Sequence, residues 1–124
     1  MELTSETMGK FTLLRLAGRI DWECAGRLDD EIGRLIDMGN RFIAFDLDGV
    51  TFLSSGGIGA LAFNTNLIRK KDGAVHLISS NEYVNELFET LKLTLVFEGA
   101  WHRTLDDFKT LSLNTAAGGP VQPS

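Results

Sequence analysis

The chain has 124 residues and a net charge of −5, with 17 acidic against 12 basic residues. This balance argues against nucleic acid or an anionic membrane as the main partner, because both attract basic proteins. The length fits one domain, the single cysteine excludes an internal disulfide, and no apolar run reaches the roughly 20 residues of a membrane span. We therefore expect a cytoplasmic protein without membrane insertion.

The first predicted strand covers residues 11–16, which read FTLLRL, and a helix follows it. Asp21 offers a helix N-cap, and Gly39 stands where helix C-termini favour glycine. Between them, apolar residues recur at helical spacing. These are Ala25, Leu28, Ile32, Leu35 and Ile36.

The second predicted strand covers residues 42–47, which read FIAFDL. Such a nearly continuous apolar run is typical of a strand buried on both faces, as in a parallel sheet. The dipeptide at residues 48–49, Asp-Gly, predicts a turn, and residues 50–53 predict a short extended segment.

A glycine-rich segment, residues 54–59, leads into a helix that we expect to run to about Lys71. Either Ser54 or Ser55 can be its N-cap, and free N–H groups there can face an anion. A phosphate on such a serine is tolerated by the helix dipole and adds about two negative charges to the surface. An unmodified N-cap is the simpler alternative. Residues 57–62, GIGALA, also match a loose dinucleotide fingerprint, which leaves a small nucleotide-binding domain open.

The helix after this segment has apolar residues on two faces, whereas a surface helix of a monomer usually has one. We therefore predict that Phe63 or Leu67 is exposed and contributes to a partner surface. A deeply packed helix is the alternative. The two faces carry Ile58, Leu61 and Ile68, and Ala60, Phe63 and Leu67.

The second half of the chain continues the alternation of strands and helices. Residues 74–78 predict a strand, and the capping-box spacing of Ser79 and Glu82 predicts the start of a helix. Residues 95–97 predict a short strand and residues 104–111 a last helix. The apolar stripe of the first of these helices is Val84, Leu87, Phe88 and Leu91.

The domain is expected to span residues 1–113. Residues 114–124 have no periodicity and contain Gly118-Gly119-Pro120, so we expect a disordered tail. The alternation before this tail implies one sheet with helices packed on it.

The chemical inventory contains no recognisable catalytic set. His76 and His102 have no cysteine or acidic residue at metal-ligand spacing, so no metal site is expected. We interpret Cys24 as a helix-packing residue. Paired carboxylates at Asp46 and Asp48 can bind a metal or act as acid and base, although the turn is the simpler interpretation. We predict no catalytic residue, no cofactor and no enzymatic activity.

Taken together, these residues resemble the STAS domain family, which is shared by sulfate transporters and bacterial anti-sigma-factor antagonists. The resemblance covers roughly residues 8–111. It implies an α/β fold with a single small mixed sheet of four to five strands packed with about four helices. The stretches that carry it are GRID at 18–21, IAFDLDGVTFL at 43–53, SSGGIGAL at 54–61 and AVHLIS at 74–79.

In the stand-alone antagonists of this family, the motif reads Asp-Ser-Ser-Gly-Leu-Gly, and its first serine accepts a phosphate. Alignment of the Gly-x-Gly places that serine at Ser55, with Ser54 in place of the aspartate and Gly56 in place of the second serine. The resemblance thus implies phosphorylation at Ser55. The implied partner-binding residues are Ser54, Ser55, Gly56, Gly57, Ile58, Gly59, Phe63 and Leu67.

The function that the resemblance implies is a switch. The unmodified protein would bind an anti-sigma factor that is also a serine kinase, phosphorylation at Ser55 would release it, and a serine phosphatase would restore binding. A STAS adaptor without phosphorylation, in another signalling or transport complex, is the alternative beside the nucleotide-binding domain. The oligomeric state is not predicted.

Overall fold

One sheet lies at the centre of the structure, a computed structural model that describes residues 1–97 and 99–110. Within them its five strands follow the chain order; the first two pair antiparallel and all later neighbours pair parallel. The predicted α/β fold with a single small mixed sheet is confirmed. The strands are β1 (Glu2–Met8), β2 (Phe11–Ile20), β3 (Phe42–Leu53), β4 (Ala74–Ile78) and β5 (Trp101–His102).

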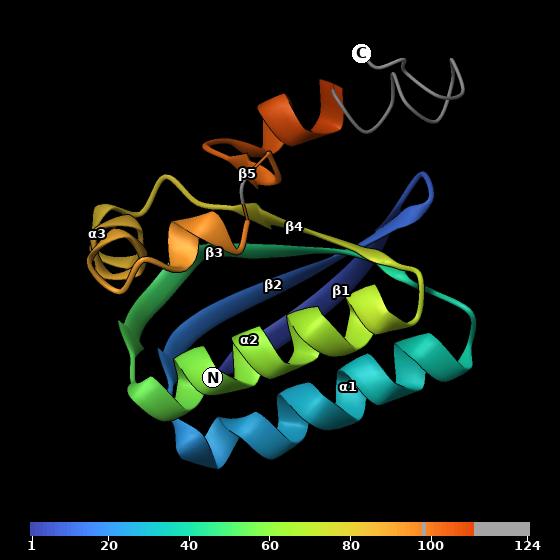
Figure 1. The fold of residues 1–124 in the computed structure, drawn as a ribbon, viewed down its shortest axis with the longest axis horizontal. Coiled ribbons are helices and arrows are strands. Elements are labelled where there is room, and N and C mark those ends of the chain that lie inside the picture. The colour runs from blue at the N-terminus through green and yellow to red at the C-terminus, as the bar shows by residue number, and fades with distance from the viewer. Residues whose placement is uncertain (98, 111–124) are drawn as a thin grey trace.

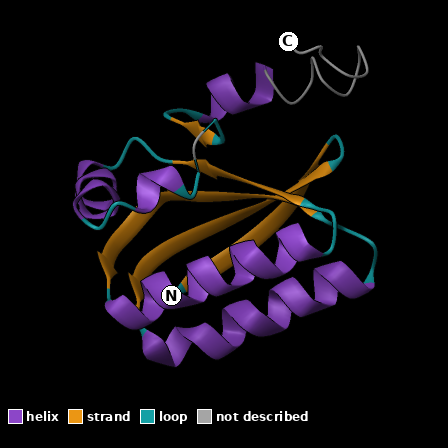
Figure 2. Cartoon of the chain, viewed as in Figure 1, coloured by secondary structure: helices purple, strands orange, loops and turns teal. Residues whose placement is uncertain are grey.

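Two long helices, α1 and α2, lie side by side along one face of this sheet (Figure 1). A short helical segment at residues 105–110 covers the opposite face, and α3 follows β4. Figure 2 shows the resulting layers, with the sheet between the helix pair and the short segment. The helices are α1 (Ala25–Asp37), α2 (Ser55–Lys70) and α3 (Glu82–Thr90), with 3-10 turns η1 (Trp22–Cys24) and η2 (Leu93–Leu95).

The core fills both faces of β3, because successive strand residues point to opposite sides. Phe45 belongs to the larger apolar cluster beneath α1 and α2, and Ala44 packs with Phe108 on the other face. Phe45 and Ala44 are both fully buried, so the prediction of a strand buried on two faces is confirmed. No helix among residues 1–97 and 99–110 is long and apolar enough to cross a membrane.

The predicted helix after β2 is confirmed, but its start differs. Asp21 caps the 3-10 turn η1, accepting from the Glu23 N–H at 3.1 Å, and α1 begins only at Ala25. Its end is as expected. Gly39 has a φ of +89°, which favours glycine, and its N–H donates to the Ile36 carbonyl at 2.9 Å.

The predicted turn at Asp48 and Gly49 is wrong, because β3 continues through both residues to Leu53. The glycine serves a different purpose here. A Cβ atom at Gly49 would lie 2.9 Å from the Cβ of Ala17 on β2, so the two strands approach more closely than a side chain permits. The pairing of β2 and β3 is irregular on both sides of this contact.

The edges of the sheet also differ from the prediction. The predicted strand at residues 95–97 is wrong: this region contains η2 and a turn, and Trp101–His102 pairs with β4 instead. β1 was not predicted, since its residues are mostly polar and exposed, as suits an edge strand. All seven residues of β1 pair with residues 11–17 of β2, and this pairing holds the strand in place.

The capping box predicted for α3 is wrong as well. Asn81 is the N-cap, and its side-chain oxygen accepts from the Tyr83 and Val84 N–H groups at 3.0 and 3.4 Å. Ser79 is fully buried, and its hydroxyl accepts from the Asn81 N–H at 3.2 Å. The predicted last helix is present at residues 105–110; the domain boundary at residue 113 and the tail 114–124 lie outside the described residues.

Candidate partner-binding site

Ser54 and Ser55 have distinct positions where α2 begins. The Ser54 hydroxyl caps α2 by accepting from the Gly57 N–H at 3.1 Å, and its carbonyl accepts from the Ile58 N–H at 2.9 Å. The Ser54 N–H donates to the Ile20 carbonyl at 3.0 Å, which ties the cap to the end of β2. Ser55 is therefore the first residue of α2, and it is exposed.

The three glycines of this segment are not equivalent. A Cβ atom at Gly57 would lie 2.5 Å from the Ile20 carbonyl oxygen, and one at Gly56 would lie 2.8 Å from the Cβ of Trp22. Gly59 has no such neighbour within 4 Å. Gly56 and Gly57 thus let α2 begin in contact with β2 and η1, whereas Gly59 faces open space.

The exposed face of α2 continues from its first residue. Ser55, Gly59 and Phe63 are each exposed and follow one another at four-residue spacing, which places them on one side of the helix. Phe63 is 61% exposed and Leu67 is half-buried, so the predicted exposure of at least one of them is confirmed. Apolar area of this kind on a surface helix is a feature of binding sites.

Trp22 enlarges this surface, and the sequence analysis missed it. Its side chain is 73% exposed although its backbone lies against Gly56. Nearby, Phe52 lies at the end of β3 with the Arg19 guanidinium 4.2 Å from its ring centroid. The signal available in the sequence was a tryptophan directly after the predicted N-cap, Asp21. Gly57, which was also predicted to bind the partner, is buried. We call residues 54–56, 58 and 59, together with Phe63, Leu67 and Trp22, the switch surface.

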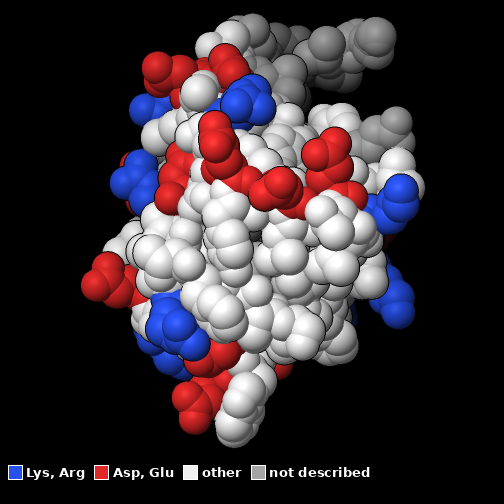
Figure 3. All heavy atoms as spheres, turned by 90° about the vertical axis from the view of Figure 1, so that its left-hand side faces the viewer, with Lys and Arg blue, Asp and Glu red and all other residues white. Residues whose placement is uncertain are grey.

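The surroundings of the switch surface are seen from the end of the molecule where α2 begins. Figure 3 shows a broad uncharged area there, with a row of acidic side chains above it at the level of α3. α3 also supports the segment before Ser54, because the Tyr83 hydroxyl accepts from the Leu53 N–H at 3.0 Å. The Asn81 amide donates to the Val50 carbonyl at 2.7 Å. The base of the switch surface is therefore fixed by hydrogen bonds.

The paired carboxylates at Asp46 and Asp48 are engaged in local structure. Asp46 accepts from the Asp48 N–H at 3.0 Å, and its other oxygen lies 3.7 Å from the Arg15 guanidinium. Burial raises the pKa of Asp46. Asp48 accepts from the Ser80 N–H at 2.6 Å, which joins β3 to the loop after β4. Among the described residues, no three His, Cys, Asp or Glu side chains are grouped to hold a metal ion.

The two histidines, which sequence reasoning treated separately, form a pair. Nδ1 of His76 and Nε2 of His102 are 2.8 Å apart, and the two rings stack with centroids 5.1 Å apart. Phe108 packs against both rings, and Phe11 packs edge-on against His76. Burial, and secondly the neighbouring His102, lower the pKa of His76 to about 4. Burial also lowers the pKa of His102. Cys24 is half-buried, with its sulfur 3.5 Å from the Arg19 carbonyl oxygen.

The fold and the start of α2 are those of a STAS domain. The profile of this family matches residues 2–108, and the chain belongs to the STAS domain family. The expectation drawn from its motifs is confirmed.

Among individual proteins, the chain is 25% identical over 97 residues to BtrV of Bordetella bronchiseptica, which is provisionally named an anti-sigma factor antagonist; the match covers 78% of this chain and 84% of BtrV. An anti-sigma factor antagonist from Mycobacterium paratuberculosis has a similar structure, with a TM-score of 0.73 and 21% identity over 94% of this chain and 93% of that one. Phosphorylated SpoIIAA from Bacillus matches with a TM-score of 0.67 and 16% identity over 86% and 95% of the two chains. At these identities the solved structures show a common fold.

Proposed function

We propose that this protein is an anti-sigma-factor antagonist that binds its anti-sigma factor through the switch surface and is released by phosphorylation at Ser55. One observation carries the proposal: Ser54 performs the capping, which leaves the exposed hydroxyl of Ser55 without a hydrogen-bond partner among the described residues. A kinase can therefore modify Ser55 without disrupting the helix. The names of BtrV and of the mycobacterial relative support the choice of partner.

The effect of the phosphate follows from its position. The N–H groups of Ser55 and Gly56 precede the first helical hydrogen bond, so with the helix dipole they stabilise an anion at this end of α2. The folded protein therefore tolerates the modification. A partner packed on an uncharged surface would instead have to accommodate about two added negative charges.

The switch operates through two partner activities. The partner is an anti-sigma factor with serine kinase activity, and a serine phosphatase restores the binding-competent form. The protein itself acts in the cytoplasm by binding, without a catalytic step of its own. The nucleotide-binding alternative has less support, because Gly57 and Gly59 of the loose fingerprint both lie within α2, whereas the fingerprint has its first glycine in the turn before the helix.

A STAS adaptor without phosphorylation is the second candidate, and Ser54 favours it, since the family pattern has an aspartate there. The two candidates differ in whether the partner modifies Ser55. Mass spectrometry after incubation with the cognate kinase and ATP should find phosphate on Ser55. Ser55→Ala should bind the partner but lose regulation, while Ser54→Ala is the matched control that should still be phosphorylated. Phosphate on Ser54 alone, or none with an authentic partner, would select the adaptor.

A further inference from the structure

The apolar area of the switch surface continues beyond α2 onto the end of β3 and the start of α3. Phe52 lies two residues before Ser54, and both Phe52 and Tyr83 are exposed. The Tyr83 hydroxyl accepts from the N–H of Leu53, the last residue of β3, at 3.0 Å. The Tyr83 side chain therefore connects α3 to the segment that leads into Ser54, and two exposed aromatic rings extend the surface toward α3.

The side of α3 next to Tyr83 is acidic. Glu82 and Glu86 are exposed, one residue before and three residues after Tyr83, and α3 contains no basic residue. Residues four apart lie on the same side of a helix, so these two carboxylates are neighbours. Figure 3 shows the row of acidic side chains directly above the uncharged area. The switch surface is therefore bordered by negative charge where it meets α3.

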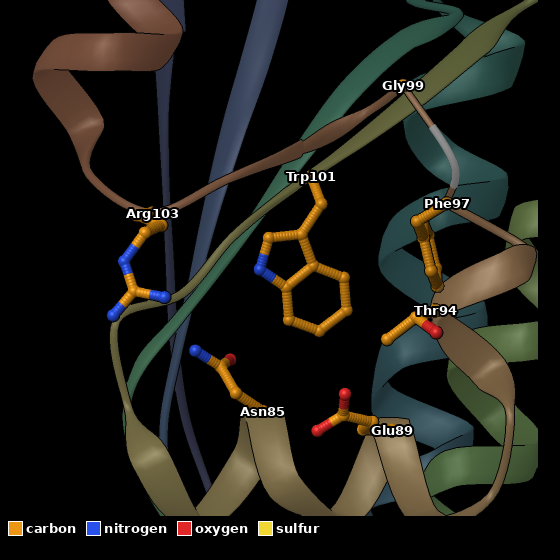
Figure 4. A pocket seen from close by; sticks show the side chains of 7 residues that line it. All are labelled: Asn85, Glu89, Thr94, Phe97, Gly99, Trp101 and Arg103. Atoms are coloured by element: carbon orange, nitrogen blue, oxygen red, sulfur yellow. The ribbon is translucent and has the colours of Figure 1, made fainter.

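Glu89 extends this acidic border by one turn of α3. It lies beside the Trp101 indole in the hollow between α3 and β5, which Arg103 also lines (Figure 4). A second hollow along α3 is lined by all three carboxylates and by Arg103. Three carboxylates against one guanidinium leave the border with a negative net charge.

Contacts within the domain do not account for this charge. No ion pair among residues 1–97 and 99–110 includes Arg103 or a residue of α3. Glu82 suits the first turn of a helix, because the helix dipole favours an anion there, but Glu86 lies beyond that turn. Like charges four residues apart also weaken a helix. The two carboxylates are therefore unfavourable for the isolated helix and are available to a partner.

We propose that the anti-sigma factor of the proposed function, on which this inference rests, also covers Phe52, Tyr83 and the first two turns of α3, and that its surface facing α3 is basic. Lysine or arginine side chains there complement Glu82 and Glu86, while its apolar part packs on the aromatic rings. Charges at the border of an interface act mainly on association, because they attract the partner before contact. A phosphate on Ser55 lies within the uncharged contact instead, so it acts on dissociation.

The test measures association and dissociation rate constants of the cognate anti-sigma factor for the parent and for Glu82→Gln combined with Glu86→Gln. At about 0.01 M salt, where the Debye length is about 30 Å, the double variant should associate about three- to tenfold more slowly, with an unchanged dissociation rate. At about 1 M salt the two association rates should converge, because the Debye length is then about 3 Å.

The matched control is Asp37→Asn combined with Asp72→Asn. It removes the same charge at the opposite end of α1 and α2 (Figure 1), and its association rate should stay within about twofold of the parent. NMR cross-saturation from the bound partner should attenuate the amide signals of Phe52 and Tyr83 but not those of Asp37 and Asp72.

The outcomes separate this border from the switch itself. If the parent binds the anti-sigma factor, equal association of the Glu82 and Glu86 double variant and the parent at low salt would overturn the inference and leave the switch function in place. Equal slowing in the control, or unattenuated signals of Phe52 and Tyr83, would overturn it as well. A parent protein that does not bind the anti-sigma factor would instead contradict the proposed function.

Discussion

Gly57 and Gly59 look alike in the sequence, yet their surroundings are opposite. Gly57→Ala should destabilise the protein by about 1–3 kcal/mol, because the new methyl group would overlap the Ile20 carbonyl. Gly59→Ala should instead stabilise it by about 0.5–1 kcal/mol, since it adds helix propensity in open space. Urea unfolding of both variants measures the difference. A similar loss of stability in both would mean that α2 does not begin in contact with β2.

The histidine pair predicts a dependence of stability on pH. The pKa of His76 is about 4 in the folded protein and about 6.5 when unfolded, so between these values the unfolded chain binds the proton that the folded protein does not. The contribution is complete above the higher value and is lost as the pH falls toward the lower one. Allowing for the partial exposure of the ring, it should be on the order of 1–2 kcal/mol.

The matched variant for this test is His76→Phe, which keeps an aromatic ring beside Phe11 but cannot titrate. Urea unfolding from about pH 7 to about pH 5 should show the parent losing more stability than the variant. Parallel losses in the two proteins would show that carboxylates alone account for the acid sensitivity.

At the scale of single residues, the sequence indicated which side chains could cap, bind or titrate, but not which contacts they make. The choice between Ser54 and Ser55 as N-cap required the backbone, because either serine can accept the Gly57 N–H or a neighbouring one. The His76–His102 contact joins residues from two parallel strands, and no local spacing encodes it. Trp22 was overlooked because its position depends on the packing of its backbone against Gly56, which has no side chain, and no sequence pattern shows this packing.

The two apolar faces of α2 differ in burial. Leu61 and Ile68 are buried under the sheet, whereas Phe63 is exposed. Phe63→Glu should weaken binding of the anti-sigma factor at least about tenfold, as loss of an aromatic anchor does, with an unchanged melting temperature.

The control for that variant is Leu61→Ala on the buried face, which should cost about 2–5 kcal/mol of stability. If Phe63→Glu lowered the melting temperature as Leu61→Ala does, Phe63 would be a core residue. Unaltered affinity of a stable Phe63→Glu variant would remove α2 from the proposed interface.

Helices and strands with regularly spaced apolar residues could be predicted from the sequence. Strands that form only because a neighbouring strand pairs with them could not. α1 and the first half of β3 contain their own signal in the spacing of buried residues. β1 is polar and depends on β2, and β5 is only two residues long beside β4. Residues 48–49 in the middle of β3 were predicted as a turn because Asp-Gly usually marks one, whereas here the glycine allows a close approach of two strands.

At the scale of the whole molecule, the core of residues 1–97 and 99–110 lies in the two clusters around β3, and the sequence of residues 114–124 has no apolar pattern. Truncation after Leu113 should therefore leave the melting temperature and the affinity for the anti-sigma factor unchanged. Calorimetric melting of the full-length and truncated proteins tests this. A truncated protein that fails to fold would place part of the core beyond residue 113.

The central claim is that one phosphate on Ser55 changes binding without changing the fold. The most direct measurement is titration calorimetry of the cognate anti-sigma factor against the unmodified protein and the protein phosphorylated at Ser55. We predict a weakening of about 1–3 kcal/mol, or roughly 5–150-fold, with equal melting temperatures of the two forms. Ser55→Asp should reproduce only part of this effect, because it adds about one charge against nearly two. Equal affinity of the phosphorylated and unmodified proteins for the anti-sigma factor would contradict the account.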